Sequence, residues 1–257
     1  MYAFKINTTA LIFFFITSFT QSSFSQISGG DWRQWTTINI KYQISNKFST
    51  TFREEIRFSD NISRLKLFSS ELALAYKPAK FFKAELGYRN IQKYQYQDPL
   101  QVDNTFDFEH KFMLNLFLFQ KFGSFSFGYR QRIQFEYDHL FTSEEGDVEK
   151  WYSRNKFVIQ YDSLKRFTPF IAAELRWQIS NPKEPEAYHK WDKARWEAGC
   201  HYRINQKHSI GVFGLLQHEW NKLPEDRSTL YVVGLMYWFK FSRIEFTDHE
   251  PKMGSPE

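Results

Sequence analysis

Charged side chains recur at every second position in several stretches of the chain. They are the residues best able to bind ions or take part in chemistry. Between residues 124 and 137, Arg130, Arg132 and Glu136 alternate with aromatic and aliphatic residues. Alternate residues of a β-strand share one face, so these charges are expected to line a single surface. Charges of both signs on one surface can form ion pairs, and a local excess of cations can attract small anionic solutes.

In each stretch, apolar residues occupy one set of alternate positions and charged residues the other. The charged residues of the second set are named here the interior charged set. Its members are Arg53, Glu55, Arg57, Glu85, Arg89, Glu109, Lys111, Arg130, Arg132, Glu136, Arg154, Lys156, Glu174, Arg176, Arg195 and Glu197. If the apolar parity faces lipid, this set lines the interior of a barrel. In a narrow barrel these side chains are expected to meet across the lumen, which leaves two alternatives: an ion-paired plug, or a narrow and somewhat cationic conduit.

Histidines are the remaining candidates for catalysis, because an outer-membrane hydrolase needs a nucleophile or an activated water beside a base. His110 and His218 fall on the apolar parity, and His139 and His189 lie in long polar stretches. None of them has a serine or aspartate partner at a spacing that indicates a catalytic group. We therefore expect a protein that is not an enzyme and that has no catalytic, cofactor-binding or metal-binding residues.

One acidic stretch leaves a weaker possibility of cation binding. Residues 143–149 read Ser-Glu-Glu-Gly-Asp-Val-Glu. Clustered carboxylates can hold a divalent cation loosely, but a solvated acidic loop has the same composition. The pattern does not separate these two interpretations.

Period-two alternation of apolar and polar residues predicts the elements that position these side chains. In residues 106–118, for example, Phe106, Phe108 and Phe112 oppose Asp107 and Glu109. Such alternation is typical of strands with one apolar and one charged face. The predicted strands are 32–43, 48–58, 65–76, 81–94, 105–120, 124–137, 151–161, 167–179, 192–204, 208–220 and 229–241. Most reach the roughly 9–11 residues that a tilted membrane-spanning strand requires.

Short and long connections alternate between these strands, which is typical of a transmembrane barrel with its short turns in the periplasm. We therefore predict an all-β fold, a transmembrane up-and-down antiparallel β-barrel of about 10–12 strands. The segments above give an odd number, whereas bacterial single-chain barrels normally have an even one. We accordingly expect ten or twelve strands, with one segment merged, split or missed.

Aromatic residues near the strand ends predict two interfacial belts. Beside the long connections lie Trp151, Trp177, Trp191 and Trp220. Beside the short turns lie Tyr76, Phe81, Phe119, Phe125, Tyr161, Phe167, Tyr202 and Phe239. The same rings could instead cap the core of a soluble β-sandwich, so the belts alone do not decide between the two folds.

The first 25 residues have the build of a secretory signal peptide. Lys5 precedes the apolar run 10–16, and small and polar residues follow up to Ser25, after which we expect cleavage. The predicted organisation is therefore a signal peptide at 1–25, a barrel at 26–241 and a polar tail at 242–257. Cys200 is the only cysteine, so no intramolecular disulfide can stabilise the exported chain.

Composition agrees with a membrane barrel and excludes some other classes. Of 257 residues, 20% are aromatic and 25% are charged, and beyond the signal peptide no apolar block reaches the length of a spanning helix. The net charge of +5 is distributed over alternating signs rather than clustered, which argues against a nucleic-acid partner. The expected location is the outer membrane of a Gram-negative bacterium. The expected partners are outer-membrane lipids and the barrel-assembly machinery, and the oligomeric state stays open.

Several short motifs resemble an uncharacterised family catalogued as domain of unknown function 2490, common in Bacteroidetes. They are Trp32 with Trp35, the segment 53–58, Tyr76-Lys77-Pro78, Gly87-Tyr88-Arg89 and Gly128-Tyr129-Arg130. The resemblance covers nearly all of the mature chain and implies an outer-membrane barrel, but no cofactor, activity or catalytic residue.

The expected function is therefore a structural or narrow transport-type barrel of the outer membrane. Two alternatives stay open. An outer-membrane lipid hydrolase would bring a Ser-His or Asp-His pair together at the outer rim. A soluble periplasmic sandwich or lipocalin-like binder would bury the Phe face and expose the Arg/Glu face.

Overall fold

Eleven strands make up the described part of the chain, which in this computed structural model comprises residues 31–95, 105–138, 150–180, 191–220 and 229–242. The strands are β1 (Asp31–Gln43), β2 (Phe48–Ser59), β3 (Arg64–Ala79), β4 (Phe82–Gln95), β5 (Thr105–Phe122), β6 (Phe125–Asp138), β7 (Lys150–Tyr161), β8 (Phe167–Ser180), β9 (Trp191–Arg203), β10 (His208–Glu219) and β11 (Thr229–Ser242). The predicted strands agree with these bounds to within a few residues. The signal peptide (1–25) and most of the tail (242–257) lie outside the described residues.

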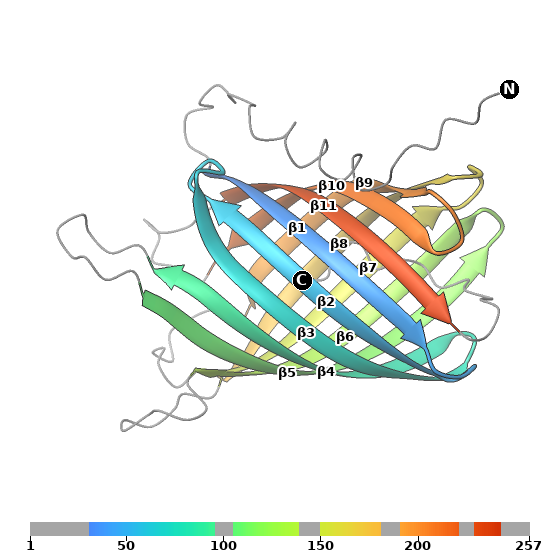
Figure 1. Cartoon of the computed structure of the whole chain (residues 1–257), viewed down its shortest axis with the longest axis horizontal. Coiled ribbons are helices and arrows are strands. Elements are labelled where there is room, and N and C mark those ends of the chain that lie inside the picture. The colour runs from blue at the N-terminus through green and yellow to red at the C-terminus, as the bar shows by residue number, and fades with distance from the viewer. Residues whose placement is uncertain (1–30, 96–104, 139–149, 181–190, 221–228, 243–257) are drawn as a thin grey trace, which may run out of the picture. The chain divides into compact units, whose positions relative to one another are not determined.

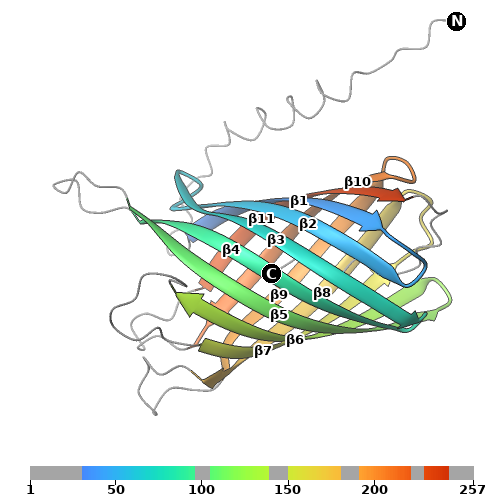
Figure 2. The same ribbon diagram turned by 60° about the horizontal axis from the view of Figure 1, so that its bottom comes forward.

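The strands form a closed barrel in chain order (Figure 1). Each strand pairs antiparallel with its neighbour in the chain, and Figure 2 shows β3 to β7 following one another around the wall. The barrel closes where β1 pairs with β11, and this pairing is parallel. The prediction of an all-β barrel is confirmed.

The expected even number of strands is wrong for the described part of the chain. When an odd number of strands alternates in direction, the first and last strands run the same way. They can then close a barrel only through a parallel ladder, and the register of β1 and β11 is such a ladder, from Asp31 opposite Leu230 to Gln43 opposite Ser242. No segment was merged or missed within the described ranges.

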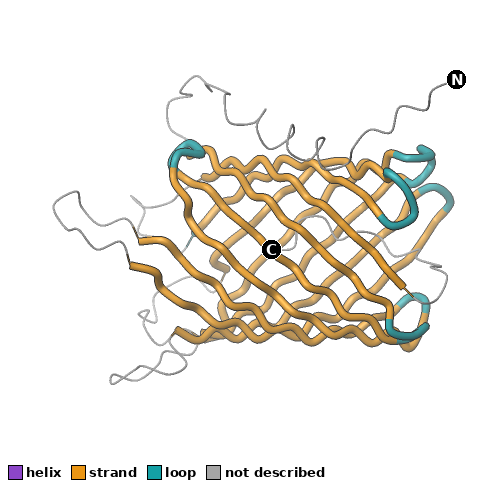
Figure 3. The backbone as a smooth tube through the Cα atoms, in the orientation of Figure 1, coloured by secondary structure: helices purple, strands orange, loops and turns teal. Residues whose placement is uncertain are grey.

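The two ends of the barrel differ in their connections. The connections 44–47, 80–81, 123–124, 162–166 and 204–207 are short and share one end, named here the short-turn end (Figure 3). At the other end, the long-loop end, the turn 60–63 is short and the other four connections are longer. Since the strand number is odd, β1 begins at the long-loop end and β11 finishes at the short-turn end.

The apolar side chains face outward and the charged ones inward. On β4, Leu86 is 64% exposed whereas Arg89, three residues further, is 1% exposed. The exposed aliphatic and aromatic residues follow the outward parity on every strand. A soluble protein buries its apolar face, so the structure contradicts the soluble sandwich and has the polarity of a transmembrane barrel. Among the described residues, no helix is long and apolar enough to cross a membrane.

Aromatic rings pair across neighbouring strands near both ends of the barrel. At the long-loop end, Trp177 contacts Trp191 edge-on with ring centroids 4.6 Å apart, and Trp151 contacts Phe135. Trp220 contacts His218 of its own segment. At the short-turn end, the paired rings are Tyr76 with Phe48, Tyr161 with Phe125, Tyr202 with Phe167, and Phe239 with His208. One assignment is wrong: Phe119 is buried and stacks on Phe117, because it falls on the inward parity of β5.

Candidate functional site

The structure places every member of the interior charged set on the inner face of the barrel. The register joins them in transverse rows, because residues directly opposite each other on paired strands share a face. One such row crosses β2 to β6 and reads Arg53, Glu71, Arg89, Lys111 and Glu136. The interior is therefore built from charged rows that succeed each other along the barrel.

Two glutamates hold three arginines together on β2, β3 and β4. Arg53 donates to Glu71 at 2.5 Å, and Arg89 donates through Nε to the other oxygen of the same carboxylate at 2.9 Å. Glu55 pairs with Arg57 and lies 4.0 Å from Arg89. Since Glu55, Glu71 and Arg89 are almost wholly buried, these charges compensate each other away from water.

A second network continues around the wall through β4, β5 and β6. Lys111 donates to Glu136 at 2.7 Å and lies 3.5 Å from Glu109. The amide of Asn115 joins two charges of opposite sign: it donates to Glu85 at 3.1 Å and accepts from Arg132 at 2.7 Å. The Asn115 amide therefore links Glu85 on β4 to Arg132 on β6.

Glu174 on β8 is the common partner of three arginines. Arg130 donates to one carboxylate oxygen at 2.6 Å, and Arg154 donates to the other at 2.5 Å. Arg195 also reaches that second oxygen, at 3.3 Å. These arginines come from β6, β7 and β9, so a single carboxylate joins its own strand, β8, to three others. All four side chains are buried.

Cations stand directly opposite one another in two adjacent rows around Glu174. The upper row, nearer the long-loop end, reads Arg132, Arg154, Arg176 and Lys193 across β6 to β9. The lower row reads Arg130, Lys156, Glu174 and Arg195. The seven cations of the two rows are named here the cationic ladder. Like charges directly opposite each other destabilise a sheet, so the ladder requires counter-anions.

The counter-anions of the ladder lie around its edges as well as in its centre. Lys156 donates to Glu197 at 2.8 Å, Arg176 donates through Nε to Asp192 at 2.9 Å, and Lys193 lies 2.8 Å from Glu219. Exposure increases toward the long-loop end: the side chains of Arg176 and Lys193 are 20% and 15% exposed, whereas the lower row is buried. The ladder thus leads from a mouth of the barrel to its centre.

Three residues of this region were absent from the interior charged set. Lys193 shares the parity of Arg195, so the alternation on β9 was a sufficient signal for it. Glu219 likewise lies opposite Lys193 on β10. The alternation on β9 places Asp192 on the outward face, so it gave no such signal. Asp192 is nevertheless buried, because the register of β8 and β9 shifts between Arg176 and Trp177.

An apolar cluster fills another part of the interior, beside the charged residues that the sequence predicted for the lumen. Its members are Trp35, Val158, Phe170, Ala172, Phe213, Leu215, Val232 and Met236. The strands β10 and β11 supply half of them, because these two strands are apolar on both faces. Trp35 joins the cluster to the charged part: the guanidinium of Arg57 lies 3.8 Å from its ring centroid, and that of Arg195 lies 5.5 Å away.

Inward-facing glycines show how tightly the interior is filled. A side chain on Gly199 would collide with the ring of Phe170, and one on Gly211 would approach His201 at 2.7 Å. Each glycine therefore leaves the space that a neighbouring ring occupies. At mid-height, Arg89, Arg132 and Lys156 are among the largest wholly buried side chains of the described residues. These large side chains are therefore packed against their neighbours at this level rather than exposed to water.

A polar row interrupts the apolar exterior on β2 to β5. It reads Glu54, Ser70, Asn90 and His110 in register. The hydroxyl of Ser70 donates to the Glu54 carboxylate at 2.9 Å, and His110 Nδ1 lies 2.8 Å from the Tyr88 hydroxyl. Polar groups facing lipid are costly, so this row is the clearest departure from a uniform lipid-facing surface.

Three of the four described histidines, His110, His208 and His218, lie beside hydroxyl groups other than serine, and the fourth, His201, stacks on Phe170. His110 lies beside Tyr88, and His218 Nδ1 lies 3.4 Å from the Thr229 hydroxyl near the long-loop end. The other two candidates, His139 and His189, lie outside the described residues, as does the acidic stretch 143–149. Within the described ranges, no group of three or more His, Cys, Asp or Glu residues is arranged to hold a metal ion.

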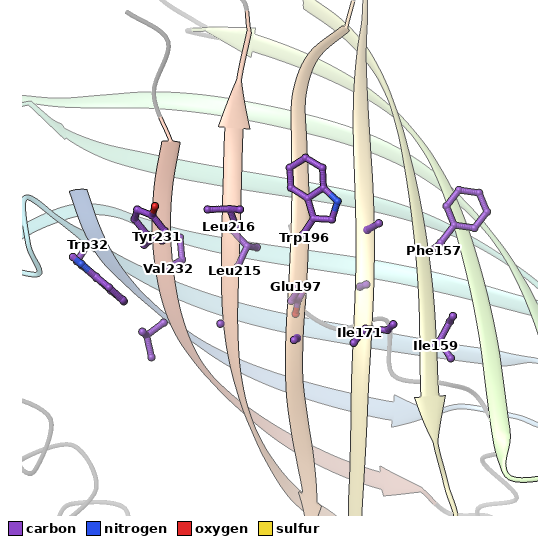
Figure 4. A pocket seen from close by; sticks show the side chains of 15 residues that line it. Trp32, Phe157, Ile159, Ile171, Trp196, Glu197, Leu215, Leu216, Tyr231 and Val232 are labelled. Atoms are coloured by element: carbon purple, nitrogen blue, oxygen red, sulfur yellow. The ribbon is translucent and has the colours of Figure 1, made fainter. Parts of the chain in front are cut away.

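The exterior also carries an apolar groove of about 780 Å³ across β7 to β11 (Figure 4). Small residues form its floor, including Ala173, Ala198 and Gly214. Larger side chains form its walls, among them Trp32, Phe157, Ile171, Trp196, Leu216 and Tyr231. Most of its lining belongs to the outward-facing apolar surface, but the buried residues Ala172, Glu197, Leu215 and Val232 also contribute to it.

Comparison with known proteins gives a family and a fold. Residues 32–228 match the family described as "Protein of unknown function (DUF2490)". The curated proteins with which the chain was compared gave no match. Four chains of solved structures match. One is the NanC porin in a rhombohedral crystal form, with a TM-score of 0.51, 12% identity, and coverage of 82% of this chain and 98% of that chain. At this identity the likeness shows the fold, a closed β-barrel.

Proposed function

The chain belongs to the DUF2490 family, whose function is unknown, and from the geometry we propose that it is a narrow outer-membrane β-barrel whose lumen is closed at mid-height. It is not a general diffusion pore. It acts either as a structural barrel or as a transport-type barrel that opens only for a specific solute.

One observation carries this proposal: large charged side chains at mid-height are buried although they point into the lumen. In an open aqueous channel, Arg89, Arg132 and Lys156 would be in contact with water. Each is almost completely inaccessible, because the ion pairs and the apolar cluster occupy the space between the walls. A narrow barrel filled by its own side chains leaves no continuous aqueous path.

The membrane assignment rests on the apolar exterior and on the porin-like fold. We propose an orientation with the short-turn end in the periplasm, as in other outer-membrane barrels. Export through a signal peptide cleaved near Ser25, contact with outer-membrane lipids and insertion by the barrel-assembly machinery belong to the same proposal. Fractionation of the native host and N-terminal sequencing of the extracted protein test the location and the cleavage site.

Conductance in planar bilayers tests the closed lumen. The purified barrel, shown to be folded by faster gel migration before boiling than after, is reconstituted alongside an open general porin as a positive control. The expected result is no steady large conductance and no swelling of liposomes in neutral sugars. A steady conductance comparable to that of the control porin would contradict the closed lumen, whereas recovery from the periplasm without detergent would contradict the membrane assignment.

The proposal contains no catalytic step. A lipid hydrolase is the competing class, and His110 and His218 are the candidates for its base among the described residues. Release of fatty acids from phospholipid vesicles is the appropriate assay, with His110→Asn and His218→Asn as matched variants. We expect no release above that of empty vesicles. Release that one of these substitutions abolishes would replace the barrel proposal with an enzymatic one.

A further inference from the structure

The cationic ladder has a composition that a purely structural plug does not require. A plug is satisfied when carboxylates separate the cations, as on β2 to β4, where Glu71 lies between Arg53 and Arg89. On β6 to β9, cations instead face cations across three successive strand pairs: Arg132 opposite Arg154, Arg154 opposite Arg176, and Arg176 opposite Lys193. This arrangement costs free energy in a sheet unless an anion lies among the cations.

Glu174 is that anion in the structure as it stands. Its two carboxylate oxygens receive guanidinium groups from three different strands, Arg130 at 2.6 Å, Arg154 at 2.5 Å and Arg195 at 3.3 Å. Planar guanidinium groups that converge on one oxyanion are the donor set that proteins use for carboxylates and phosphates. Glu174 is also the single carboxylate of its row, between Lys156 and Arg195.

The ladder connects this carboxylate with the long-loop mouth. Arg176 and Lys193 are the most exposed of its cations, and Arg130 and Lys156 are buried. A negatively charged solute at that mouth would be attracted first by the partly exposed pair and then by the guanidiniums below. The positive potential therefore runs in the direction in which a solute would have to move.

We propose that the arginines around Glu174 form a binding site for a small oxyanion, a carboxylate or phosphate group of a solute. In the closed barrel the Glu174 side chain occupies this site as an internal substitute. A solute anion that enters from the long-loop mouth displaces Glu174, and this exchange separates the strand contacts that the carboxylate holds together. This inference rests on the proposed function, since it concerns a transport-type barrel with a closed lumen and identifies the class of solute that would bind inside it.

Replacement of Glu174 by glutamine tests the site, because it removes the internal anion but keeps the shape of the side chain. The matched control is Glu197→Gln: Glu197 is equally buried and binds Lys156 at 2.8 Å, but it is not the carboxylate on which Arg130, Arg154 and Arg195 converge. Wild type and both variants are refolded in detergent, and thermal unfolding is followed by heat-modifiable mobility. Sodium chloride, sodium phosphate and sodium succinate are compared at equal ionic strength, so that general screening affects all samples alike.

We expect phosphate and succinate to raise the unfolding midpoint of Glu174→Gln well above its value in chloride. Wild type and Glu197→Gln should respond little. In wild type Glu174 already fills the site, and only the small fraction of barrels in which it has left can bind phosphate, so the apparent affinity is low. Phosphate should therefore bind Glu174→Gln at least about tenfold more tightly than wild type. An equal response of both variants, an equal effect of chloride, or no response of folded Glu174→Gln would each overturn the proposal.

If Glu174→Gln does not fold, Glu174→Asp takes its place. Aspartate keeps the charge but is one methylene shorter, so it should leave the three arginines incompletely bound and give an intermediate response to phosphate. Folded Glu174→Asp that is indifferent to phosphate would equally overturn the inference. Wild-type conductance separates the two proposals: a large steady conductance contradicts the closed lumen, whereas a closed wild type with an unresponsive Glu174 variant contradicts the oxyanion site alone.

Discussion

The ring of Phe213 on β10 occupies the space above Gly234 on β11. The two residues lie directly opposite each other in the register, and a methyl group on Gly234 would come within 1.9 Å of the ring. Only glycine at position 234 therefore allows the Phe213 ring to lie this close to the backbone of β11. The ring in turn packs inside the apolar cluster with Trp35 and Met236, so it has no free space into which it could move.

Gly234→Ala is expected to destabilise the barrel by about 1 to 3 kcal/mol, because the Phe213 ring must shift within an interior that is already filled. Gly214→Ala is the matched control. Gly214 lies on the outward face next to Phe213, and no atom lies within 4 Å of an added methyl group. Its effect should stay within about 0.5 kcal/mol. Urea unfolding in lipid vesicles measures both, and equal effects would show that the interior around Phe213 is not closely packed.

Trp35 is expected to be among the most sensitive single positions of the barrel. It is buried in the apolar cluster and lies beneath the guanidinium of Arg57 at 3.8 Å. Trp35→Ala removes a large packed ring and a cation–π contact, which should cost about 3 to 5 kcal/mol. Trp35→Phe should lie between alanine and wild type.

The control for this position is Trp196→Ala on the exterior groove. Trp196 is exposed, and lipid chains can fill the space that its ring leaves. A loss below about 1 kcal/mol is expected in the same urea titration. A comparable loss at both tryptophans would mean that the interior cluster contributes no more than the lipid-facing surface.

The local pattern predicted most of the strands because their two faces differ in polarity. Residues 106–118 and 124–137 alternate so regularly that no other element fits them. The strand β10 is different: Ile210, Val212 and Leu216 face outward, but Phe213 and Leu215 face inward and are equally apolar. Which parity lies inside depends there on pairing with β9 and β11, so the apolar cluster could not be found from the sequence.

Pairing also determined what the sequence left open about the candidate site. Alternation placed Glu174, Arg130 and Arg154 on one face, but it could not show that these residues of three strands meet at one carboxylate. That contact depends on the register of β6, β7 and β8.

The predicted segments gave the correct odd number of strands, but the rule that bacterial barrels have an even number led to a wrong expectation. The rule applies to barrels closed by an antiparallel pair, which β1 and β11 do not form.

A disulfide across the parallel seam tests the strand number directly. Thr36 on β1 lies opposite Leu235 on β11, so cysteines at these two positions, in a Cys200→Ser background, are expected to be close enough to oxidise. The boiled, non-reduced chain would then be closed into a loop and migrate differently from the reduced chain. The pair Thr36 and Val212 is the control, because Val212 lies one strand further, on β10. A twelfth strand between β1 and β11 would prevent the Thr36–Leu235 disulfide.

Glu54 and Glu71 allow the same substitution to be made on opposite faces of the barrel. Glu54 lies mid-strand on the outward parity of β2, between exposed Phe52 and Ile56, and accepts a hydrogen bond from Ser70. A lipid-facing carboxylate is unfavourable near the bilayer midplane, so Glu54→Leu should stabilise the barrel in vesicles by about 1 to 2 kcal/mol. Loss of the hydrogen bond to Ser70 lowers this gain but should not reverse it.

Glu71→Leu should have the opposite sign. Glu71 faces inward and binds both Arg53 and Arg89, so its removal leaves two buried cations without their shared carboxylate and should cost about 3 to 5 kcal/mol. Urea unfolding in vesicles compares the two variants under identical conditions. If Glu54→Leu destabilised the barrel and Glu71→Leu stabilised it, the lipid would lie against the charged face, and both the membrane orientation and the closed lumen would have to be abandoned.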